Sequence, residues 1–315
     1  MTSVPLAAKM LDFLKSYGYI PSRVYLLLRS LEETPDNMSL SRQMSLMWRG
    51  YVPRHVQHYN LDDYNLDDYL SLLEKEKMAF EIDSEDAHNL DNKRLFFLIL
   101  ESIHTEFQLP ELYGAGEVTS VLQSKELVAK PKDGKCGVGV RVLSNPSDLR
   151  ESDLTNNNTL FMEKMEPPEW MPTYQDGLGT LRLFTLDGRV TGAIVRLPTE
   201  DSYPVDNWSN GGMIAGVDLE TGKINQVYTR DQDNEIVETT SHPDTGETVM
   251  GVEVPHFDQA VCEVESLTGE FPSARVIGWD LVPYENEVVI LEANRNPNLE
   301  MMQLFRPARF SYERS

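Results

Sequence analysis

Two apolar segments near the end of the chain, residues 276–282 (VIGWDLV) and 288–294 (VVILEAN), constrain its fold most strongly. A short polar turn separates them, so they predict a β-hairpin. A loop centred on Asn286 would set Asp280 directly opposite Glu292. The hairpin therefore places two carboxylates across from each other on an otherwise apolar pair of strands.

Asn294 extends this group, because side chains alternate along a strand and Asn294 shares a face with Glu292. Opposed carboxylates repel each other, so the group needs a cation between its members. Carboxylate and amide oxygens suit Mg²⁺, with Mn²⁺ as the alternative, and Mg²⁺ is often held by carboxylates together with nucleotide phosphates. We interpret Asp280, Glu292 and Asn294 as ligands of a metal that carries ATP. A solvated sheet face is the alternative interpretation.

The composition is typical of an ordered globular protein. The chain has 315 residues and 40% hydrophobic content, enough for two or three packed subdomains, and its net charge is −23. An acidic surface repels phosphate backbones and anionic lipid, which disfavours nucleic acid and membrane surfaces as partners. Because ATP is also an anion, it needs a local basic pocket, and the lysines become informative.

Cysteine usage and hydropathy bear on the compartment. Cys136 and Cys262 show no CxxC spacing, and we find neither a signal peptide nor a run of 18 apolar residues. We therefore expect a reduced, cytoplasmic setting and no membrane span. The sequence is compatible with either a monomer or a homo-oligomer.

The second chemical signal is the lysine- and glycine-rich segment at residues 130–140 (KPKDGKCGVGV). Strand-like runs flank it, so it predicts a strand, glycine loop, strand arrangement and not a Walker loop or a dinucleotide-binding turn. Its glycines let backbone N–H groups approach phosphate, and Lys130 adds positive charge. These glycines are Gly134, Gly137 and Gly139. An ordinary glycine-rich hairpin is the alternative, with Cys136 as a small packing residue.

Three further segments carry candidate binding groups. Residues 159–165 predict a strand that leaves the sheet at Glu166, either as an ordinary edge strand or to present main-chain groups to adenine. Arg182 and Arg196 lie on a hairpin with an Asp-Gly turn, and a buried arginine there needs an anionic partner. His242 lies in a turn, where it is either structural or acts at the acceptor side.

The remaining pattern is largely helical at the start of the chain. Residues 1 to about 80 show helical spacing, and the tandem repeat at 59–68 places acids near a helix start, which we favour over a calcium site. Further helices are predicted from Asn92 to before Pro110 and over 257–267. Beyond the last strand lie amides that we expect near the phosphates or the acceptor substrate: Asn296, Asn298 and Gln303.

In this order, the segments resemble the ATP-grasp superfamily, and within it the sugar-transfer associated ATP-grasp family. The resemblance covers about residues 90 to 305. It is carried by an ordered set of motifs: 128–131 (VAKP) with the glycines after it, 180–182 (TLR), Asn207 with Gly211 and Gly212, 242–246 (HPDTG), 277–280 (IGWD) and 291–294 (LEAN).

The resemblance implies an α+β fold in which two α+β subdomains grip ATP. The expected organisation is a helical region at 1–90, a subdomain with the glycine-rich flap at 91–165, and a C-terminal subdomain with the metal site at 166–315.

The resemblance also implies roles for individual residues. Lys130 would contact the nucleotide phosphates, Lys93 is the candidate for the family's earlier lysine, and the flap glycines would close over the β and γ phosphates. Arg182 would steady the transferring phosphoryl group or an acyl phosphate, with Lys130 as its catalytic companion. The segment along adenine would be Glu163, Lys164, Met165 and Glu166. The acidic ribose contact falls on Glu166 or Glu169, because Pro167 and Pro168 disturb the usual spacing.

The implied activity is that of an ATP-dependent carboxylate–amine ligase that forms an amide through an acyl phosphate. Its small-molecule substrates would belong to cell-surface polysaccharide biosynthesis or to an amino-acid-linked precursor. No Ser-His-Asp or Cys-His set indicates covalent catalysis. A phosphotransferase that stops at a phosphorylated product is one alternative, and a non-catalytic nucleotide-binding protein is another. The clustered acids argue against the second.

Overall fold

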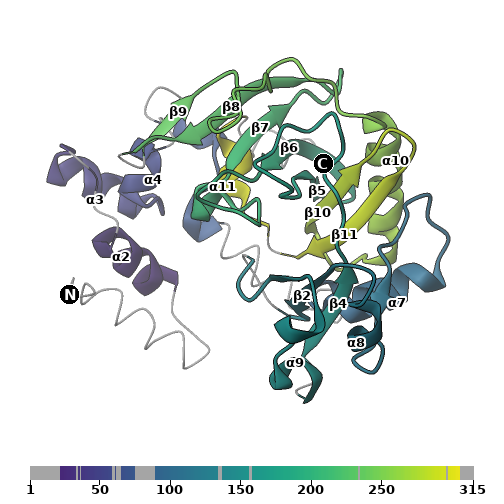
Figure 1. Cartoon of the computed structure of the whole chain (residues 1–315). Helices are drawn as coiled ribbons and strands as arrows, with labels where there is room; N and C mark the ends of the chain where they lie inside the picture. Colours follow the sequence, from purple (N-terminus) through teal and green to yellow (C-terminus); the bar gives the residue numbers. More distant parts are fainter. Residues whose placement is uncertain are drawn as a thin grey trace. The chain divides into compact units, whose positions relative to one another are not determined.

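The computed structural model describes residues 22–305 except 33–34, 36, 59–60, 62–64, 75–88, 134–136, 156–157, 233–234 and 296 (Figure 1). The chain divides into two compact units. One unit joins residues 1–83 to 299–315, and the other comprises residues 84–298. The domain boundaries expected at residues 90 and 165 stay predictions, because this division does not address subdomains within the second unit.

The first unit is helical in its described part, as its apolar spacing predicts. Its elements are α2 (Ser22–Glu32), α3 (Leu40–Trp48), α4 (Pro53–His58), the 3₁₀ helix η2 (Leu66–Asp68) and α11 (Leu299–Gln303). A small core forms around buried Leu46, Tyr51 and Val56. The Tyr51 hydroxyl donates to the carbonyl oxygens of Leu66 and Tyr69 at 2.6 and 2.7 Å, which ties the segment after α4 to this core.

The structure shows the bonding partners of two residues that the sequence analysis considered in this unit, Gln303 and Asp67. The Gln303 amide oxygen accepts from Leu70 N at 2.6 Å and its amide nitrogen donates to Leu70 O at 3.2 Å, and its expected place near the phosphates or the acceptor substrate stays a prediction. Asp67 lies in the short η2 and pairs with Arg49 at 2.5 Å. Asp62 and Asn296 lie outside the described residues.

The second unit is built on a seven-stranded antiparallel sheet in the order β11-β10-β5-β6-β7-β8-β9. The strands are β5 (Thr180–Leu186), β6 (Arg189–Leu197), β7 (Met213–Val217), β8 (Ile224–Arg230), β9 (Ile236–Glu238), β10 (Val276–Pro283) and β11 (Val288–Asn294). The short 3₁₀ helices η4 (Trp208–Asn210) and η5 (Thr268–Glu270) lie in its connections. Both predicted hairpins are therefore confirmed.

The register of the last hairpin sets Asp280 opposite Glu292, as the sequence predicts. Counting outward from the turn does not give this pairing, because Pro283 pairs with Val288. A bulge between Asp280 and Leu281 shifts the register and restores it. The bulge thus brings the two carboxylates to the same point on neighbouring strands.

Two helices cover the apolar face of this sheet: α7 (Lys93–Ser102), capped by Asn92, and α10 (Phe257–Leu267), whose bounds match the prediction. Phe96 of α7 packs against Trp279 of β10 inside one continuous core, with ring centroids 6.4 Å apart and the rings tilted by 54°. The Trp279 indole N–H donates to the Thr185 hydroxyl at 3.0 Å, so its polar edge is satisfied. Burial of these aromatic rings fixes α7 on the sheet.

A smaller antiparallel sheet, in the order β1-β4-β2-β3, belongs to the same unit. Its elements are β1 (Leu112–Tyr113), β2 (Leu127–Pro131), β3 (Arg141–Leu143) and β4 (Thr159–Glu163), with α8 (Val118–Val121), α9 (Glu151–Thr155) and the 3₁₀ helix η3 (Pro146–Asp148). The glycine-rich segment connects β2 to β3. The α+β class is therefore confirmed, with both sheets antiparallel. Within the described residues, no helix has the length and apolarity that a membrane crossing requires.

Leu183 tests whether this core carries the fold. It is fully buried on β5, so Leu183→Ala should lower the free energy of unfolding by about 2–5 kcal/mol through lost burial and a cavity. Urea denaturation followed by circular dichroism measures the change. Leu98→Ala is the matched control, because Leu98 on α7 is 42% exposed and should change stability by less than about 0.5 kcal/mol. Equal losses for both variants would contradict this view of the core.

Candidate active site

The centre of the site is a buried ion pair between neighbouring strands. Asp280 on β10 pairs with Arg182 on β5. The guanidinium Nε lies 2.6 Å from Oδ1 of Asp280, and Nη2 lies 2.6 Å from Oδ2. Burial opposes the charged form of Asp280, but attraction by Arg182 and then by Arg196 lowers its pKa to about 2. The carboxylate is therefore ionised near neutral pH.

Arg196 on β6 joins the same carboxylate from the other side. Its Nη2 lies 3.1 Å from Asp280 Oδ2 and 3.3 Å from Asp206 Oδ2. The Thr180 hydroxyl accepts from Arg196 and donates to Asp206 at 2.5 Å. Burial raises the pKa of Asp206, and attraction by Arg196 opposes that shift. Two arginines and two aspartates thus form one network inside the protein.

Glu292 and Asn294 lie beside this network on β11. The Asn294 amide donates to Glu292 Oε1 at 3.2 Å, and the other carboxylate oxygen lies 3.6 Å from Lys93 Nζ. Lys93 is the first residue of α7, and its backbone N–H donates to Lys132 O at 2.9 Å. That bond holds the start of α7 against the end of β2, where the flap begins.

Lys130 on β2 is the fourth cation of the site. Its side chain is buried, and burial lowers its pKa, while attraction by Glu292 opposes the shift and repulsion by Lys93 adds to it. Among the residues that the structure describes, its ammonium group has neither a hydrogen bond nor an ion pair. A buried amine without a partner is costly unless a ligand supplies one.

The described part of the flap lies against the larger sheet's connections. Gly137 and Gly139 have φ of +68° and +80°, a conformation that favours glycine. A Cβ on Gly137 would lie 2.5 Å from the Asn207 side-chain nitrogen and 3.3 Å from Val205. Only glycine permits this close approach. Gly134 and Cys136 lie outside the described residues.

The segment after β4 combines polar anchors with free main-chain groups. The Lys164 ammonium contacts Asp176, Glu126 and Glu166 at 2.5, 3.0 and 3.4 Å. In the described part of the chain, the N–H and C=O of Met165 have no hydrogen-bond partner.

An apolar cluster lies beside this segment. Buried Met162, Val282, Val289 and Leu291 form its core, and Met165 packs against it. The Glu163 carboxylate accepts from Glu111 N at 2.8 Å, so it is held by the residue before β1. The exit of β4 thus offers one donor, one acceptor and an apolar surface at the same place.

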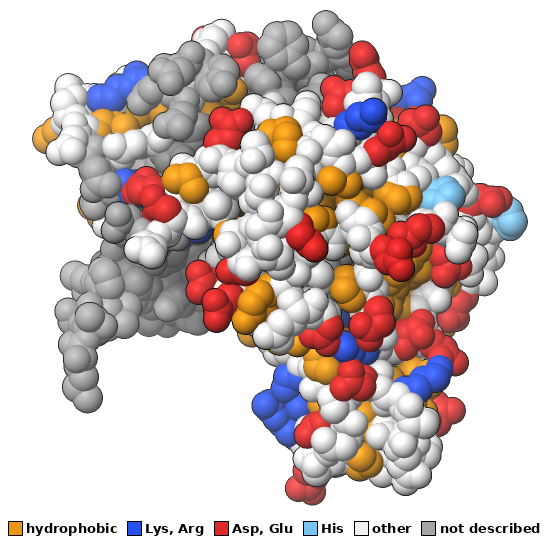
Figure 2. All heavy atoms as spheres, turned by 45° about the horizontal axis from the view of Figure 1, so that its top comes forward, with side chains coloured by type: hydrophobic (Ala, Val, Ile, Leu, Met, Phe, Trp, Pro, Cys, Tyr) orange, Lys and Arg blue, Asp and Glu red, His pale blue; other side chains and the backbone are white. Residues whose placement is uncertain are grey.

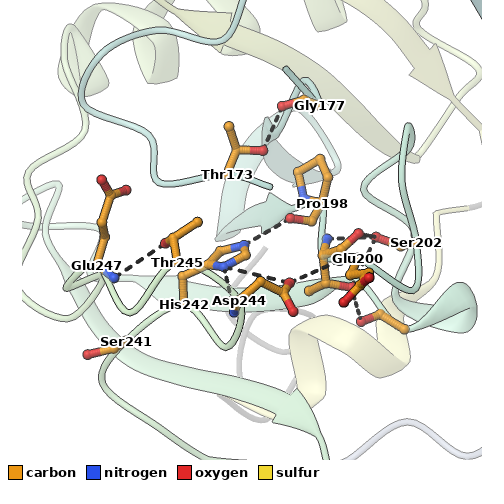
Figure 3. A network of polar contacts seen from close by, with 12 residues as sticks. Thr173, Gly177, Pro198, Glu200, Ser202, Ser241, His242, Asp244, Thr245 and Glu247 are labelled. Atoms are coloured by element: carbon orange, nitrogen blue, oxygen red, sulfur yellow. Dashed lines mark hydrogen bonds and ion pairs between the residues drawn. The ribbon is translucent and has the colours of Figure 1, made fainter. Parts of the chain in front are cut away.

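His242 belongs to a separate network (Figure 3). Its side chain is wholly buried, its Nε2 lies 2.9 Å from Pro198 O, and its Nδ1 accepts from Asp244 N at 3.3 Å. The Asp244 carboxylate in turn accepts from Glu200 N at 2.9 Å. Both ring nitrogens hold loops together, which favours the structural role of this histidine.

Sequence reasoning missed Asp206, named Thr180 only as part of the motif at 180–182, and named Arg196 only as a charge that needs a partner. That need is confirmed for both hairpin arginines. Asp206 directly precedes the Asn207 motif, so a search for an acid to match the second arginine could have found it. The sequence also assigned all charge compensation of Asp280 to a metal, whereas Arg182 and Arg196 supply much of it.

The model of sugar-transfer associated ATP-grasp proteins matches residues 82–309, most of the chain. The chain belongs to this ATP-grasp family. No curated protein sequence matches this chain.

Three solved structures resemble this ATP-grasp protein at low identity. They are D-cycloserine synthetase DcsG (14% identity, 73% of this chain and 77% of that chain, TM-score 0.43), D-alanine–D-alanine ligase from Bacillus anthracis (13%, 73% and 63%, TM-score 0.41) and the ATP-grasp ligase PsnB in complex with minimal precursor (11%, 71% and 57%, TM-score 0.42). The ATP-grasp protein thus spans less than two thirds of the length of the last two.

The chemistry of the acids bears on whether this ATP-grasp protein could hold a metal. Within the described residues, no group of three or more His, Cys, Asp or Glu side chains forms a metal cluster. Asp280, Glu292 and Asn294 nevertheless offer an all-oxygen donor set, and Glu292 is 24% exposed at its side chain. Mg²⁺ commonly takes one or two carboxylates and completes its shell with phosphate and water. The donor set therefore fits Mg²⁺ that arrives with a nucleotide.

Asp280 and Glu292 should respond differently to loss of charge. Asp280→Asn leaves Arg182 and Arg196 buried with their shared carboxylate removed, so we expect a loss of about 3–5 kcal/mol in the free energy of unfolding. Glu292→Gln should lose less than about 1.5 kcal/mol, because this group is partly exposed and Lys93 lies 3.6 Å away. Urea titration of both variants measures this. Similar losses would contradict the central place of Asp280.

The lowered pKa of Asp280 also predicts a dependence on pH. Its pKa is about 2 in the folded protein and about 3.9 in an unfolded chain. Its stabilising contribution is therefore complete above the unfolded value and is lost as the pH falls from about 4 to about 2. The stability difference between the wild type and Asp280→Asn should shrink over this window. A constant difference from pH 5 to pH 2 would contradict the assignment.

Proposed function

We propose that this protein is an ATP-dependent carboxylate–amine ligase. One observation carries the proposal: all four Lys and Arg side chains that are buried in the described chain belong to this one site. They are Lys93, Lys130, Arg182 and Arg196. A chain with a net charge of −23 has no structural need to bury its cations together. Phosphate groups of a nucleotide explain this concentration of positive charge.

The phosphates are assigned to the lysines and the flap. Lys130 has an ammonium group without a partner among the described residues, and Lys93 faces the same acid, Glu292. Gly137 and Gly139 keep the flap backbone free of side chains, so its N–H groups can approach the β and γ phosphates. Gly134 is assigned to the same contact.

Adenine is assigned to the exit of β4. The Met165 N–H and C=O match the donor and acceptor pattern of an adenine edge, and the cluster around Met162, Val282 and Leu291 supplies apolar contact. Glu163, Lys164 and Glu166 complete this segment, and Lys164 is fixed by its ion pairs. The ribose contact is assigned to Glu166 or Glu169.

The metal is assigned to Asp280, Glu292 and Asn294. Mg²⁺, or Mn²⁺ in its place, would supply charge neutralisation of the triphosphate when bound. The chain's own part is to set these oxygens: Arg182 fixes the Asp280 carboxylate and Asn294 donates to Glu292. These bonds orient the acids before a ligand arrives.

The reaction follows from these groups. A substrate carboxylate attacks the γ-phosphorus of ATP, ADP leaves, and an acyl phosphate forms. An amine then attacks the acyl carbon, phosphate leaves, and the amine loses a proton to give an amide. Arg182 uses Nε and Nη2 on Asp280, while Nη1 has no acceptor among the described residues and is placed to steady the transferring group. Lys130 adds charge from the other side of the site.

The acceptor pair is assigned by the family's association with sugar transfer. Cell-surface polysaccharide precursors that carry a carboxylate or an amine fit this association, as does an amino-acid-linked precursor. Work on such precursors with ATP as the energy source fits the cytoplasm.

Incubation of the protein with Mg-ATP and pools of carboxylates and amines tests the proposal. ADP release should require both a carboxylate and an amine, and mass spectrometry should detect a product lighter by one water than the two substrates together. ADP release with a carboxylate or another acceptor alone would instead indicate a phosphotransferase. Nucleotide binding without turnover would indicate a non-catalytic protein.

Glu292→Gln tests the assignment of the site within the active protein. It should keep the fold and reduce ADP release at least about 100-fold, because the charge that positions the triphosphate is lost. Asp187→Asn is the matched control, since it removes a carboxylate that pairs with Arg275 at 2.6 Å on the turn between β5 and β6. That variant should retain full turnover. Unchanged turnover in Glu292→Gln would refute the metal assignment.

A further inference from the structure

Helices α2 and α3 expose an unusual amount of apolar surface. The described chain has eleven large hydrophobic side chains that are exposed, and six of them lie in these two helices. The six are Val24, Leu27 and Leu31 on α2 and Leu40, Met44 and Trp48 on α3. A soluble surface normally scatters such residues singly, so their concentration in 25 residues indicates a contact surface.

The spacing on α3 separates two faces. Leu46 is fully buried in the small core of this unit, whereas Leu40, Met44 and Trp48 repeat every four residues along the outside. They are 71%, 63% and 82% exposed. The inner face already satisfies the fold, so the outer stripe is additional apolar surface.

Arg23 joins the two helices at the end of this stripe. Its guanidinium group lies 5.7 Å from the centre of the Trp48 ring and donates to the carbonyl oxygens of Met47 and Trp48 at 3.3 and 3.0 Å. The most exposed aromatic side chain of the surface is therefore held against α2 and positioned at the helix end. Trp and Arg together are typical of the boundary between lipid headgroups and acyl chains.

The charge of this region is opposite to that of the rest of the chain. Residues 1–58 contain seven Lys or Arg and four Asp or Glu, a net charge of +3, which leaves −26 for the remainder of the total −23. Residues 37–61 contain three arginines and no acid at all. Figure 2 shows acidic side chains spread over the drawn face, with a few basic side chains next to hydrophobic ones at its upper left.

Salt screens charges beyond about 10 Å at 0.1 M, so the charge that governs a contact is local. The average acidity of the chain, which disfavours anionic lipid, does not apply to α2 and α3. A second copy docked through the same surface would bring Arg23 and Arg42 against their equivalents, whereas Arg49 already pairs with Asp67 at 2.5 Å. Anionic headgroups complement these arginines and accept the apolar stripe beneath them.

We propose that α2 and α3 form a peripheral binding surface for anionic membrane lipid. The stripe Leu40, Met44 and Trp48 enters the boundary of the acyl chains, and the arginines of both helices contact phosphate headgroups. This contact is made by the surface of the helices and requires no helix to cross the bilayer. It is independent of the proposed ligase reaction.

Trp48 provides a direct probe for the test. The chain has four tryptophans, of which Trp208 and Trp279 are buried and Trp170 is partly buried, so Trp48, at 82%, is the most exposed of the four. Vesicles of phosphatidylcholine and phosphatidylglycerol in equal parts should shift its emission to the blue, and brominated acyl chains should quench it. Co-sedimentation of the full chain with these vesicles gives the bound fraction.

Binding should fall about tenfold or more when pure phosphatidylcholine replaces the anionic mixture, or when salt rises from about 0.1 to 1 M. Leu40→Ser with Met44→Ser should weaken co-sedimentation by about tenfold or more and keep the Trp48 probe. Leu95→Ser with Leu98→Ser is the matched control, because it removes two exposed leucines from α7. That control should bind like the wild type.

Two results would overturn the proposal. One is absence of co-sedimentation with anionic vesicles by a protein whose circular dichroism is native. The other is a dimer in lipid-free sedimentation equilibrium that Leu40→Ser with Met44→Ser dissociates, since the stripe would then be an interface between copies.

Discussion

The buried carboxylate of Asp280, held between Arg182 and Arg196, is the constraint on which the second unit depends. These three charges lie on the neighbouring strands β10, β5 and β6, and alternation along the strands places them on the face opposite the apolar core that contains Leu183, Val195 and Trp279. Taking ions out of water costs several kcal/mol each, so such a network is seldom kept for stability alone. It does fix register, because a slip of one residue would move Asp280 to the other face of the sheet and leave both arginines uncompensated.

The network also explains how an acidic chain can keep several buried cations at one place. Asp280 and Asp206 hold the two arginines, Glu292 holds Lys93, and the cations are thereby kept in place without a ligand. Lys130 differs, because burial depresses its pKa and the described residues give its ammonium no bond. The site is thus organised around fixed charge with one unsatisfied amine, an arrangement suited to a ligand that brings its own negative charge.

Local patterns account for what the sequence could predict. Alternation and turn length located both hairpins, and apolar spacing with a capping Asn92 located α7 and α10. The lysines, the flap and the acids were identified from residue type and order. The structure brings these residues to one place, and their roles as ligands remain proposals. Their arrangement depends on strand pairs that are distant in the chain, which no local pattern records.

The contacts that the sequence could not predict depend on β-bulges and on partners that are distant in the chain. Counting from the Asp187-Gly188 turn would pair Arg196 with Gly179, but a bulge between Phe184 and Thr185 shifts the pairing to Thr180. That single residue places Arg196 beside Asp280 and Asp206. The partner of Gln303 could not be predicted for a similar reason, since Leu70 lies 233 residues away in the chain. The residue type shows that a side chain needs a partner, but which residue becomes that partner depends on the tertiary structure.

Charge illustrates the same distinction at the scale of the whole chain. A net charge of −23 is an average, and electrostatic contact in salt is decided within about 10 Å. The local charge differs from this average at two places. Four cations are buried beside Asp280, and residues 37–61 contain no acid. Neighbouring carboxylates pair with three of these buried cations, and Lys130 has no such bond among the described residues, which is the basis for proposing a ligand there. The acid-free segment includes the exposed apolar stripe of α3, and that combination is the basis for proposing a lipid-binding surface there.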